Sequence, residues 1–502
     1  MVTGKFIMLA FQKFSTRKFH GSAHRSSSWR ASMKKELETT SPKQSDLVCI
    51  YRVPSNMRLV EPKAYRPNNI SIGPCHYGAP HLQEMEKLKS NLFRRLFDPR
   101  GPNGAKLDMA MSEMEKLQDR ARSCYYDPIK LSRDEFLQMM LIDASFIIQL
   151  LRDLSKGKFR QVPHYLNRWM LPTIRRELIM LENQLPLFVL SELFSLTGND
   201  PAECQTLEAL ALGFFYPLLQ ADSDKTSERN EIECEHFLDL VRSSILPNKV
   251  SEERGKQSGT IRSITELKKA GVKIKSDEHG RLLDIKIERK WFGFTRELTI
   301  PPLYINDHRG TLLRNIVAFE QCHKKCKPDV TSYLFFFNGL INSAEDVGLL
   351  HYKEVLHHCL GSDEEVAELM NKISIEVVLD EHESYLYKVV GDANSHFRSF
   401  RARIRVALVH HYFSSWVVGI STVGAFLALY FTFIQTVLNG ADALPKFSKL
   451  NGDTFGSILK GTLLLPLEEL NKFFRKLFVT ARSEYLSWGD LRELCVEICL
   501  TE

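Results

Sequence analysis

The chain has 502 residues, 44% of them hydrophobic, which is enough to bury a sizeable core in one large domain or in two or three smaller ones. Its formal net charge is +6, but residues 1–35 contain eight Lys and Arg and no Asp or Glu, which leaves the remainder at −2 (6 minus 8). A nearly neutral body excludes the broad basic surface of a general nucleic-acid-binding protein, so we expect no nucleic-acid partner.

Residues 1–48 form a basic, Ser-rich segment that we interpret as a disordered arm. The run of Lys, Arg, Ser, Thr and Phe at 13–19 is also typical of an organellar transit peptide, so organellar targeting stays open as an alternative. A secretory signal is not expected, because the apolar stretch at 6–11 is too short for the hydrophobic region of such a signal.

Residues 49–400 are expected to form one helical soluble domain. Apolar residues at steps of three and four along 136–151 predict a helix with one buried face. The stretch 175–194 has the same pattern, and Pro186 inside it predicts a kink or a break between two helices. Polar stretches predict loops at 199–201, 223–233 and 251–259.

A small β element is predicted near 271–300. Leu283, Ile285 and Ile287 alternate with polar residues, and a second short strand pattern follows at 297–300. Such alternation predicts a hairpin or a three-stranded sheet, whose third strand would lie at 272–274.

Helical patterns return after this insert, at 311–322 and at 363–370. Ser362, with Glu three residues later, predicts an N-cap for the second of these helices. The body is therefore expected to be mainly α, a large helical domain with a small β hairpin or sheet insert.

One further element is predicted near the C-terminus. Residues 416–438 contain no charged side chain, and a helix of that length can cross the roughly 30 Å hydrocarbon core of a bilayer. We therefore predict a C-terminal transmembrane helix from Trp416 to Leu438, with a buried core helix as the alternative. Gly419 and Gly424 within it weakly suggest homo-oligomers held together through the membrane helix.

The flanks of this span suggest its orientation. Residues 401–415 would form a basic juxtamembrane segment, and the positive-inside rule then places the N-terminal domain in the cytoplasm, with the plasma membrane as the favoured location. Residues 439–502 would be a C-terminal extension, partly helical. The basic residues that carry this argument are Arg398, Arg401, Arg403 and Arg405.

The sequence offers few residues with recognisable chemistry. Its ten cysteines are scattered, as is typical of reduced thiols, and the pairs Cys322/Cys326 and Cys495/Cys499 lack further ligands at metal-site spacing. Cys75 stands beside His76, but adjacent side chains usually diverge and seldom form a nucleophile–base pair. Glu320, His323, His357 and His358 share no metal-ligand spacing. We therefore expect no metal, no cofactor and no catalytic residue.

Several segments resemble a plant protein family of uncharacterised activity, DUF247 (UPF0481). They begin at 50–54, 64–78 and 85–89, and continue at 140–146, 181–190, 265–272, 300–304 and 313–320. Within them, the residues that carry the resemblance, which we interpret as structural, are Arg52, Pro54, Tyr65, Pro67, Gly73, Pro74, His76, Glu86, Lys89, Glu182, Asn183, Gln184, Pro186, Pro301 and Pro302. The family usually has an aromatic residue where Cys75 stands, and usually ends soon after its membrane span.

The resemblance implies a single-pass membrane protein of plants with undefined activity, some grass relatives being implicated in pollen self-incompatibility. Together with the missing catalytic motifs, it favours a non-enzymatic recognition, signalling or protein-interaction component with a protein partner of unknown identity. The alternative is an enzyme with an unrecognised active site in the helical domain. Glu182, Asn183 and Gln184, three polar residues before Pro186, are interpreted as tying off backbone groups released at the break.

Overall fold

The computed structural model describes residues 29–35, 47–157, 163–198, 205–219, 234–246, 255, 259–290, 295–380, 382–411, 421, 424–425 and 427–436. The chain divides into two units, 1–48 and 49–502. In the first unit, residues 29–35 are helical, and the run at 13–19 lies outside the described residues. So do most of the predicted loops and the whole predicted extension 439–502.

Within its described residues, the second unit is mainly helical, with two small sheets. Its helices are α2 (Ser55–Val60), α3 (Gln83–Leu96), α4 (Leu107–Ser123), α5 (Arg133–Lys156), α6 (Met170–Glu177), α7 (Leu187–Thr197), α8 (Leu207–Leu219), α9 (Phe237–Ile245), α10 (Ile264–Lys269), α11 (Asp307–Cys322), α12 (Asp329–Leu340), α13 (Ala344–Tyr352), α14 (Asp363–Ser374), α15 (Tyr387–Arg398) and α16 (Phe400–His411). Its strands are β1 (Val272–Ser276), β2 (Lys286–Lys290), β3 (Thr295–Ile300), β4 (Leu303–Ile305) and β5 (Leu356–His358).

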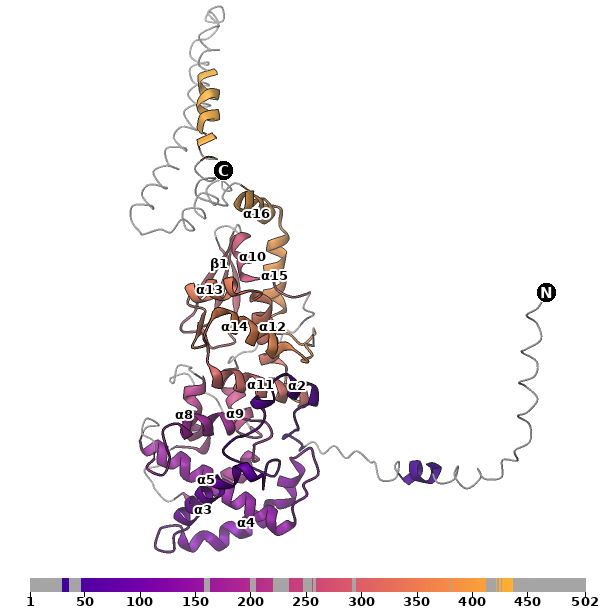
Figure 1. Ribbon diagram of the computed structural model, residues 1–502, viewed down its shortest axis with the longest axis vertical. Coiled ribbons are helices and arrows are strands. Elements are labelled where there is room, and N and C mark those ends of the chain that lie inside the picture. The colour runs from indigo at the N-terminus through magenta and orange to yellow at the C-terminus, as the bar shows by residue number, and fades with distance from the viewer. Residues whose placement is uncertain are drawn as a thin grey trace, which may run out of the picture. The chain divides into compact units, whose positions relative to one another are not determined.

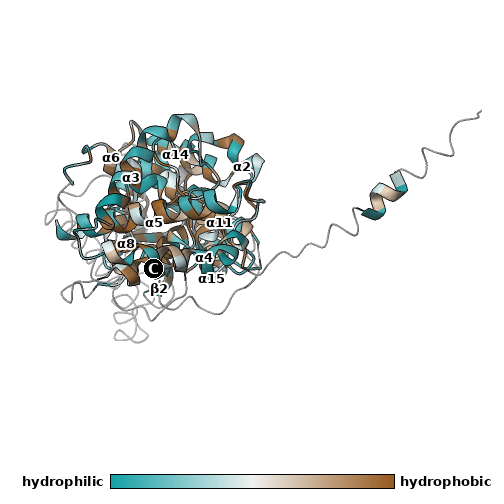
Figure 2. Ribbon diagram, turned by 90° about the horizontal axis from the view of Figure 1, so that it is seen from below, coloured by the Kyte–Doolittle hydropathy of each residue, from teal (hydrophilic) through white to brown (hydrophobic). Residues whose placement is uncertain are grey.

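Two long helices organise the core. α5 packs against α3, α4, α7 and α8, and its capping box joins Ser132 to Glu135 at the first turn. α11 packs against α6, α8 and α9 as well as α12 and α14, so it joins the earlier helices to the later ones (Figure 1). Figure 2 shows apolar residues gathered around these two helices and polar residues on the outside. Phe146 of α5 and Phe319 of α11 are fully buried.

The predicted β insert is a three-stranded mixed sheet of order β1-β3-β2, in which β1 is parallel and β2 antiparallel to β3. Leu283, in a turn, and Ile285 are buried but precede β2, so the alternating pattern began earlier than the strand. A second sheet, the parallel pair β4 and β5, was not predicted. Its strands have three residues each, which is too short for a pattern of alternation.

The chain is broken, not kinked, at Pro186. α6 ends at Glu177 and α7 begins at Leu187, directly after the proline, whose fixed φ suits a position just before a helix. The intervening residues 178–186 are not helical. The predicted N-cap at Ser362 is confirmed, because its hydroxyl accepts a hydrogen bond from the Glu365 amide at 3.4 Å.

The predicted transmembrane helix is wrong. Within the part of the chain that the structure describes, no helix combines the length and apolar character needed to cross a bilayer. Trp416, Gly419 and Leu438 lie outside that part, and the longest described helical run in 416–438 is 427–436, about 15 Å at the usual rise per residue.

The assignment to the plasma membrane with a cytoplasmic N-terminal domain is wrong for the same reason, because it depended on that span. The basic residues taken as its flank belong to helices instead. Arg398 is the last residue of α15, and Arg401, Arg403 and Arg405 lie on α16, which packs against α10 and α15. Arg405 is only 7% exposed.

Candidate functional site

The segment 49–78 has little regular structure and is held by buried polar side chains from elsewhere. The fully buried Glu177 carboxylate accepts hydrogen bonds from the backbone amides of Asn68 (2.9 Å), Asn69 (3.0 Å) and Ile70 (2.8 Å). These three amides would otherwise need a strand or a helix as partner. The Glu177 carboxylate at the end of α6 thus supplies the hydrogen-bond acceptors that a strand or a helix would otherwise provide.

Asn183 and Gln184 continue this support. The Asn183 side chain accepts from the Ile72 amide at 2.7 Å and donates to the carbonyls of Ile70 and Glu177. The Gln184 amide group donates to the carbonyls of Leu178 and Met180 at 2.7 and 2.9 Å. Gln184 therefore binds carbonyls of the non-helical stretch 178–186, and Asn183 joins the end of α6 to the segment 49–78.

A buried ion pair supports the turn at Gly73. Lys89 of α3 is fully buried and donates to Asp143 of α5 at 2.6 Å and to the Ser71 carbonyl at 2.5 Å, with Glu86 at 2.6 Å. The second Asp143 oxygen accepts from the Gly73 amide at 2.9 Å. Burial raises the pKa of Asp143 to about 6. Burial alone would lower the pKa of Lys89, but the charges of Asp143 and Glu86 raise it by more, so this pKa is raised overall. Lys89 and Asp143 are therefore both charged at neutral pH.

A third buried carboxylate, Glu182, contacts two arginines. Its side chain is completely buried and accepts from the Val53 amide at 2.7 Å and from Arg58. Arg52 approaches its other oxygen at 3.5 Å and donates to Asp127 at 2.8 Å. The two arginine side chains are 47% and 31% exposed. Each arginine side chain thus contacts the buried Glu182 carboxylate while part of the side chain remains exposed.

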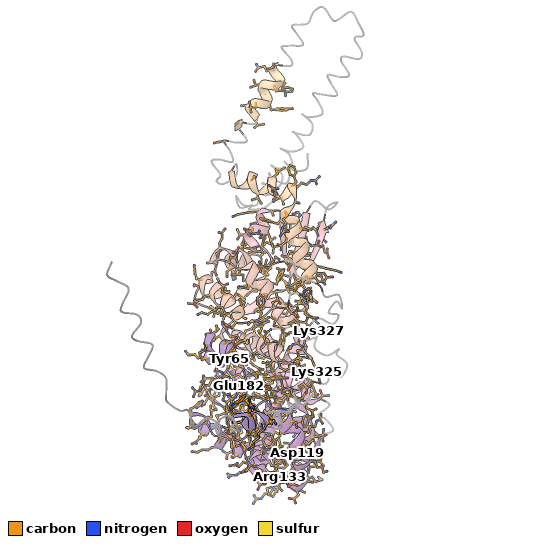
Figure 3. The ribbon with its side chains drawn as sticks, turned by 90° about the vertical axis from the view of Figure 1, so that its right-hand side faces the viewer. Tyr65, Asp119, Arg133, Glu182, Lys325 and Lys327 are labelled. Carbon is orange, nitrogen blue, oxygen red and sulfur yellow. The ribbon has the colours of Figure 1, made fainter. Side chains whose placement is uncertain are left out.

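His76 completes this group, with its Nε2 atom 3.6 Å from Glu182. We call Arg52, Arg58, His76, Asp127 and Glu182 the Glu182 cluster. Figure 3 shows Glu182 and Tyr65 at nearly the same level along the long axis, with Asp119 of α4 and Arg133 of α5 toward one end. The residues of the Glu182 cluster come from four separate parts of the sequence, at 52–58, 76, 127 and 182.

The thiol of Cys75 and the imidazole of His76 are poor candidates for nucleophilic catalysis. Burial, and then the Glu182 charge, raises the pKa of Cys75 to about 12. Burial, and then the charges of Arg52 and Arg58, lowers the pKa of His76 to about 4. A reactive cysteine needs the opposite arrangement, a lowered thiol pKa beside a base able to take its proton.

The other residues considered as ligands have separate structural contacts. Glu320 accepts from Arg242 at 2.8 Å and from Thr331, while His323 contacts the Tyr51 hydroxyl at 3.1 Å. His357 stacks on Tyr304, and His358 lies 2.9 Å from Asp363. Within the described ranges, no group of three or more His, Cys, Asp and Glu side chains could hold a metal ion. Cys495 and Cys499 lie outside those ranges.

The structure brings together most, but not all, of the residues that carry the family resemblance. Pro54 precedes α2, Pro67 accepts a hydrogen bond from His81, Pro74 follows Gly73 in the turn, and Tyr65 is 2% exposed. Pro301 and Pro302 lie apart from the cluster, between β3 and β4. Sequence reasoning missed Arg58, Asp143, Glu177 and Asn315. A single acidic residue inside an apolar helical pattern, as at Asp143, was the available signal.

These features define a mainly helical protein in which buried charged and amide side chains bind the backbone of the irregular segment 49–78. Two arginines of that segment, Arg52 and Arg58, remain partly exposed. A family model described as "Plant protein of unknown function" (DUF247) matches residues 50–431, and the chain belongs to this family. A UPF0481 protein of Arabidopsis thaliana is 26% identical over 416 residues, covering 78% of this chain and 86% of the relative. A putative UPF0481 protein of the same plant is 25% identical, covering 74% and 86%. No solved structure matches the chain.

Proposed function

We propose that this protein is a binding component that recognises another protein through the Glu182 cluster. The observation that carries the proposal is the buried Glu182 carboxylate, which holds Arg58 and Arg52 in place while both remain partly exposed. The contacts of Arg52 use its Nε and Nη1 atoms and those of Arg58 use Nη2, so further N–H donors remain for a partner. Fixing a guanidinium beforehand lowers the entropy cost of binding a carboxylate.

Three exposed apolar side chains that are sequence neighbours of cluster residues support the same proposal. Leu59, directly after Arg58, is 80% exposed, and Tyr126, directly before Asp127, is 58% exposed. Tyr77, directly after His76, is 37% exposed. Arginine and tyrosine dominate the binding energy of many protein interfaces. The partner we propose therefore carries acidic side chains beside an apolar patch.

The test compares two double variants of the full chain as bait for proteins from plant-cell extract. Leu59→Glu with Tyr126→Glu changes exposed residues that adjoin the cluster in sequence, and Trp169→Glu with Tyr352→Glu changes exposed residues elsewhere. We expect at least one protein bound by the wild type to be lost with the first variant and retained with the second, as quantified by mass spectrometry. The proposal fails if no protein is bound specifically, or if both variants bind alike.

The alternative function, an enzyme with an unrecognised site, is not favoured by a specific arrangement of the described residues. The closest thiol and imidazole, Cys75 and His76, have pKa shifts that run against nucleophilic catalysis. A recognition role therefore remains our proposal.

A further inference from the structure

A basic cavity lies on the opposite part of the fold from α3, α4 and α5, where α10, β1 and α16 meet. It encloses about 290 Å³. Its charged lining residues are Lys268, Lys273, Lys275, Lys353, Arg405 and Glu297. Five positive side chains thus face one cavity together with a single carboxylate.

The local structure brings these residues together. Lys273 and Lys275 alternate along β1, so both point to the same face of the sheet, and both are exposed. Lys268 comes from the last turn of α10, and Lys353 directly follows α13. The hydroxyl of Ser276, at the end of β1, donates to the Glu354 carbonyl at 2.8 Å and ties the strand to the segment that carries Lys353.

Gly271 lets Arg405 reach the cavity. Its φ of +92° is a conformation that side-chain-bearing residues rarely adopt, and an added Cβ would lie 3.1 Å from Arg405 Cδ and 3.3 Å from Nε. The arginine side chain therefore packs directly on the glycine backbone. Since Arg405 belongs to α16, the cavity is closed on one side by that helix.

Among the described lining residues, one carboxylate, that of Glu297, accompanies the five cationic side chains. Glu297, the pairing partner of Lys273, lies 3.8 Å from Lys290 Nζ, and Glu288 contacts the same ammonium group at 2.7 Å. Like charges held close together repel one another, and a bound anion removes that cost. The described lining thus carries more positive than negative formal charges, and an anionic ligand would add favourable interactions with them.

We propose that this cavity binds a small molecule or headgroup carrying several phosphate groups. Lysine ammonium groups bind phosphate as point charges, and Arg405 adds a planar donor. A volume of about 290 Å³ is near the lower end for ligand pockets and suits a compact polyanion. The lining residues include no aromatic side chain on which a nucleic-acid base could stack. This proposal is independent of the Glu182 cluster.

The first experiment titrates the full-length protein with inositol trisphosphate by isothermal titration calorimetry at physiological ionic strength. Lys273→Glu with Lys275→Glu should weaken binding about tenfold or more, because two charged donors are lost and repulsion is added. The control, Lys87→Glu with Lys130→Glu, changes the net charge equally on exposed lysines elsewhere and should bind like the wild type. Both variants should melt within a few degrees of the wild type, which excludes misfolding as the cause.

A second pair of measurements separates a free phosphate compound from a lipid headgroup. Co-sedimentation uses phosphatidylcholine vesicles with and without phosphatidylinositol bisphosphate. Binding to the free inositol trisphosphate alone, or to it and the phosphoinositide vesicles, supports the proposal and distinguishes the two sources. Amide hydrogen exchange in α16 should slow when inositol trisphosphate is bound, because Arg405 anchors that helix to the ligand.

The proposal is overturned if the wild type does not bind inositol trisphosphate, or if the Lys273/Lys275 double variant binds it equally well. It is also overturned if the Lys87/Lys130 control loses binding to the same extent, since attraction by net charge alone would then explain the result. Displacement of inositol trisphosphate by duplex DNA at equal phosphate concentration would likewise contradict a site shaped for a small ligand.

Discussion

At the scale of single residues, Gly73 and Gly78 differ in a way that can be measured. Both have positive φ, at +71° and +76°. A Cβ at Gly73 would lie 2.5 Å from the Gln184 carbonyl oxygen and 3.0 Å from the Tyr125 hydroxyl, whereas nothing lies within 4 Å of one at Gly78. Gly73 allows its turn to pack closely against Gln184, whereas Gly78 is needed only for the backbone conformation of its own turn.

We predict that Gly73→Ala lowers the free energy of unfolding by about 2 to 5 kcal/mol, the sum of backbone strain and steric overlap. Gly78→Ala has the strain alone and should cost about 1 to 2 kcal/mol. Urea unfolding followed by circular dichroism measures both. Equal effects of the two substitutions would show that the contact between Gly73 and Gln184 is not a tight one.

At the scale of elements, the N-terminus of α9 depends on the protonation state of His236. Its Nε2–H donates to the Cys49 carbonyl at 3.1 Å, so its Nδ1 must be the acceptor for the Asp239 amide at 3.2 Å. That arrangement needs a neutral ring, because a proton on Nδ1 would face the amide hydrogen. The side chain is completely buried, and burial lowers the pKa of His236 to about 4.

This depressed pKa predicts a loss of stability in mild acid. His236 takes up a proton near pH 6.5 in the unfolded chain and only near pH 4 in the folded one. Its contribution to the free energy of unfolding is therefore present above pH 6.5 and is lost as the pH falls toward 4. Between pH 7 and pH 5 the loss should be about 2 kcal/mol. His236→Asn keeps a capping oxygen that does not titrate, so its unfolding free energy should change less over that range. An unchanged pH dependence in the variant would contradict the assignment.

The elements predicted best are those whose own sequence pattern determines them. The helices at 136–151 and 363–370 are present as parts of α5 and α14, because their apolar spacing and caps are local. β4 and β5 were missed, since each depends on a partner strand far away in the chain. The membrane helix was wrong because no helix of the described residues is long and apolar enough to cross a bilayer, and a lack of charge in the sequence does not by itself determine the length of a helix.

The candidate site was only partly predictable for a related reason. Glu182, Asn183 and Gln184 stood out as polar residues in an apolar run, and the structure shows all three buried. Their partners were not apparent, because the Glu182 contacts to Val53 and Arg58 span 129 and 124 residues of sequence. A pattern within one segment can indicate that a polar group needs a partner, but it does not say which one.

At the scale of the whole molecule, Asn315 of α11 contacts both the segment 49–78 and the non-helical stretch 178–186. It is fully buried, accepts from the Leu181 amide at 2.9 Å and donates to the Ala64 carbonyl at 2.8 Å. Leu181 is next to Glu182. The Asn315 side chain of α11, the helix that joins the earlier helices to the later ones, therefore also helps to position the Glu182 cluster.

We predict that Asn315→Ala lowers the free energy of unfolding by about 2 to 4 kcal/mol, because two buried backbone groups lose their partner. The control is Asn371→Ala on the exposed surface of α14, which should change it by less than about 0.5 kcal/mol. Amide hydrogen exchange at Leu181 should also become faster in the first variant only. Unaltered exchange at Leu181 would mean that Asn315 does not hold this segment.

The dependence of 49–78 on side chains far along the chain has a consequence during protein synthesis. The amides of Val53 and Ile70 bind carboxylates that follow them by 129 and 107 residues. A ribosome adding about 5 to 20 residues per second needs roughly 5 to 25 seconds to supply those partners. During that interval the segment has emerged but cannot assume its final conformation, so we expect a chaperone that protects nascent chains to bind this segment until its partners are made.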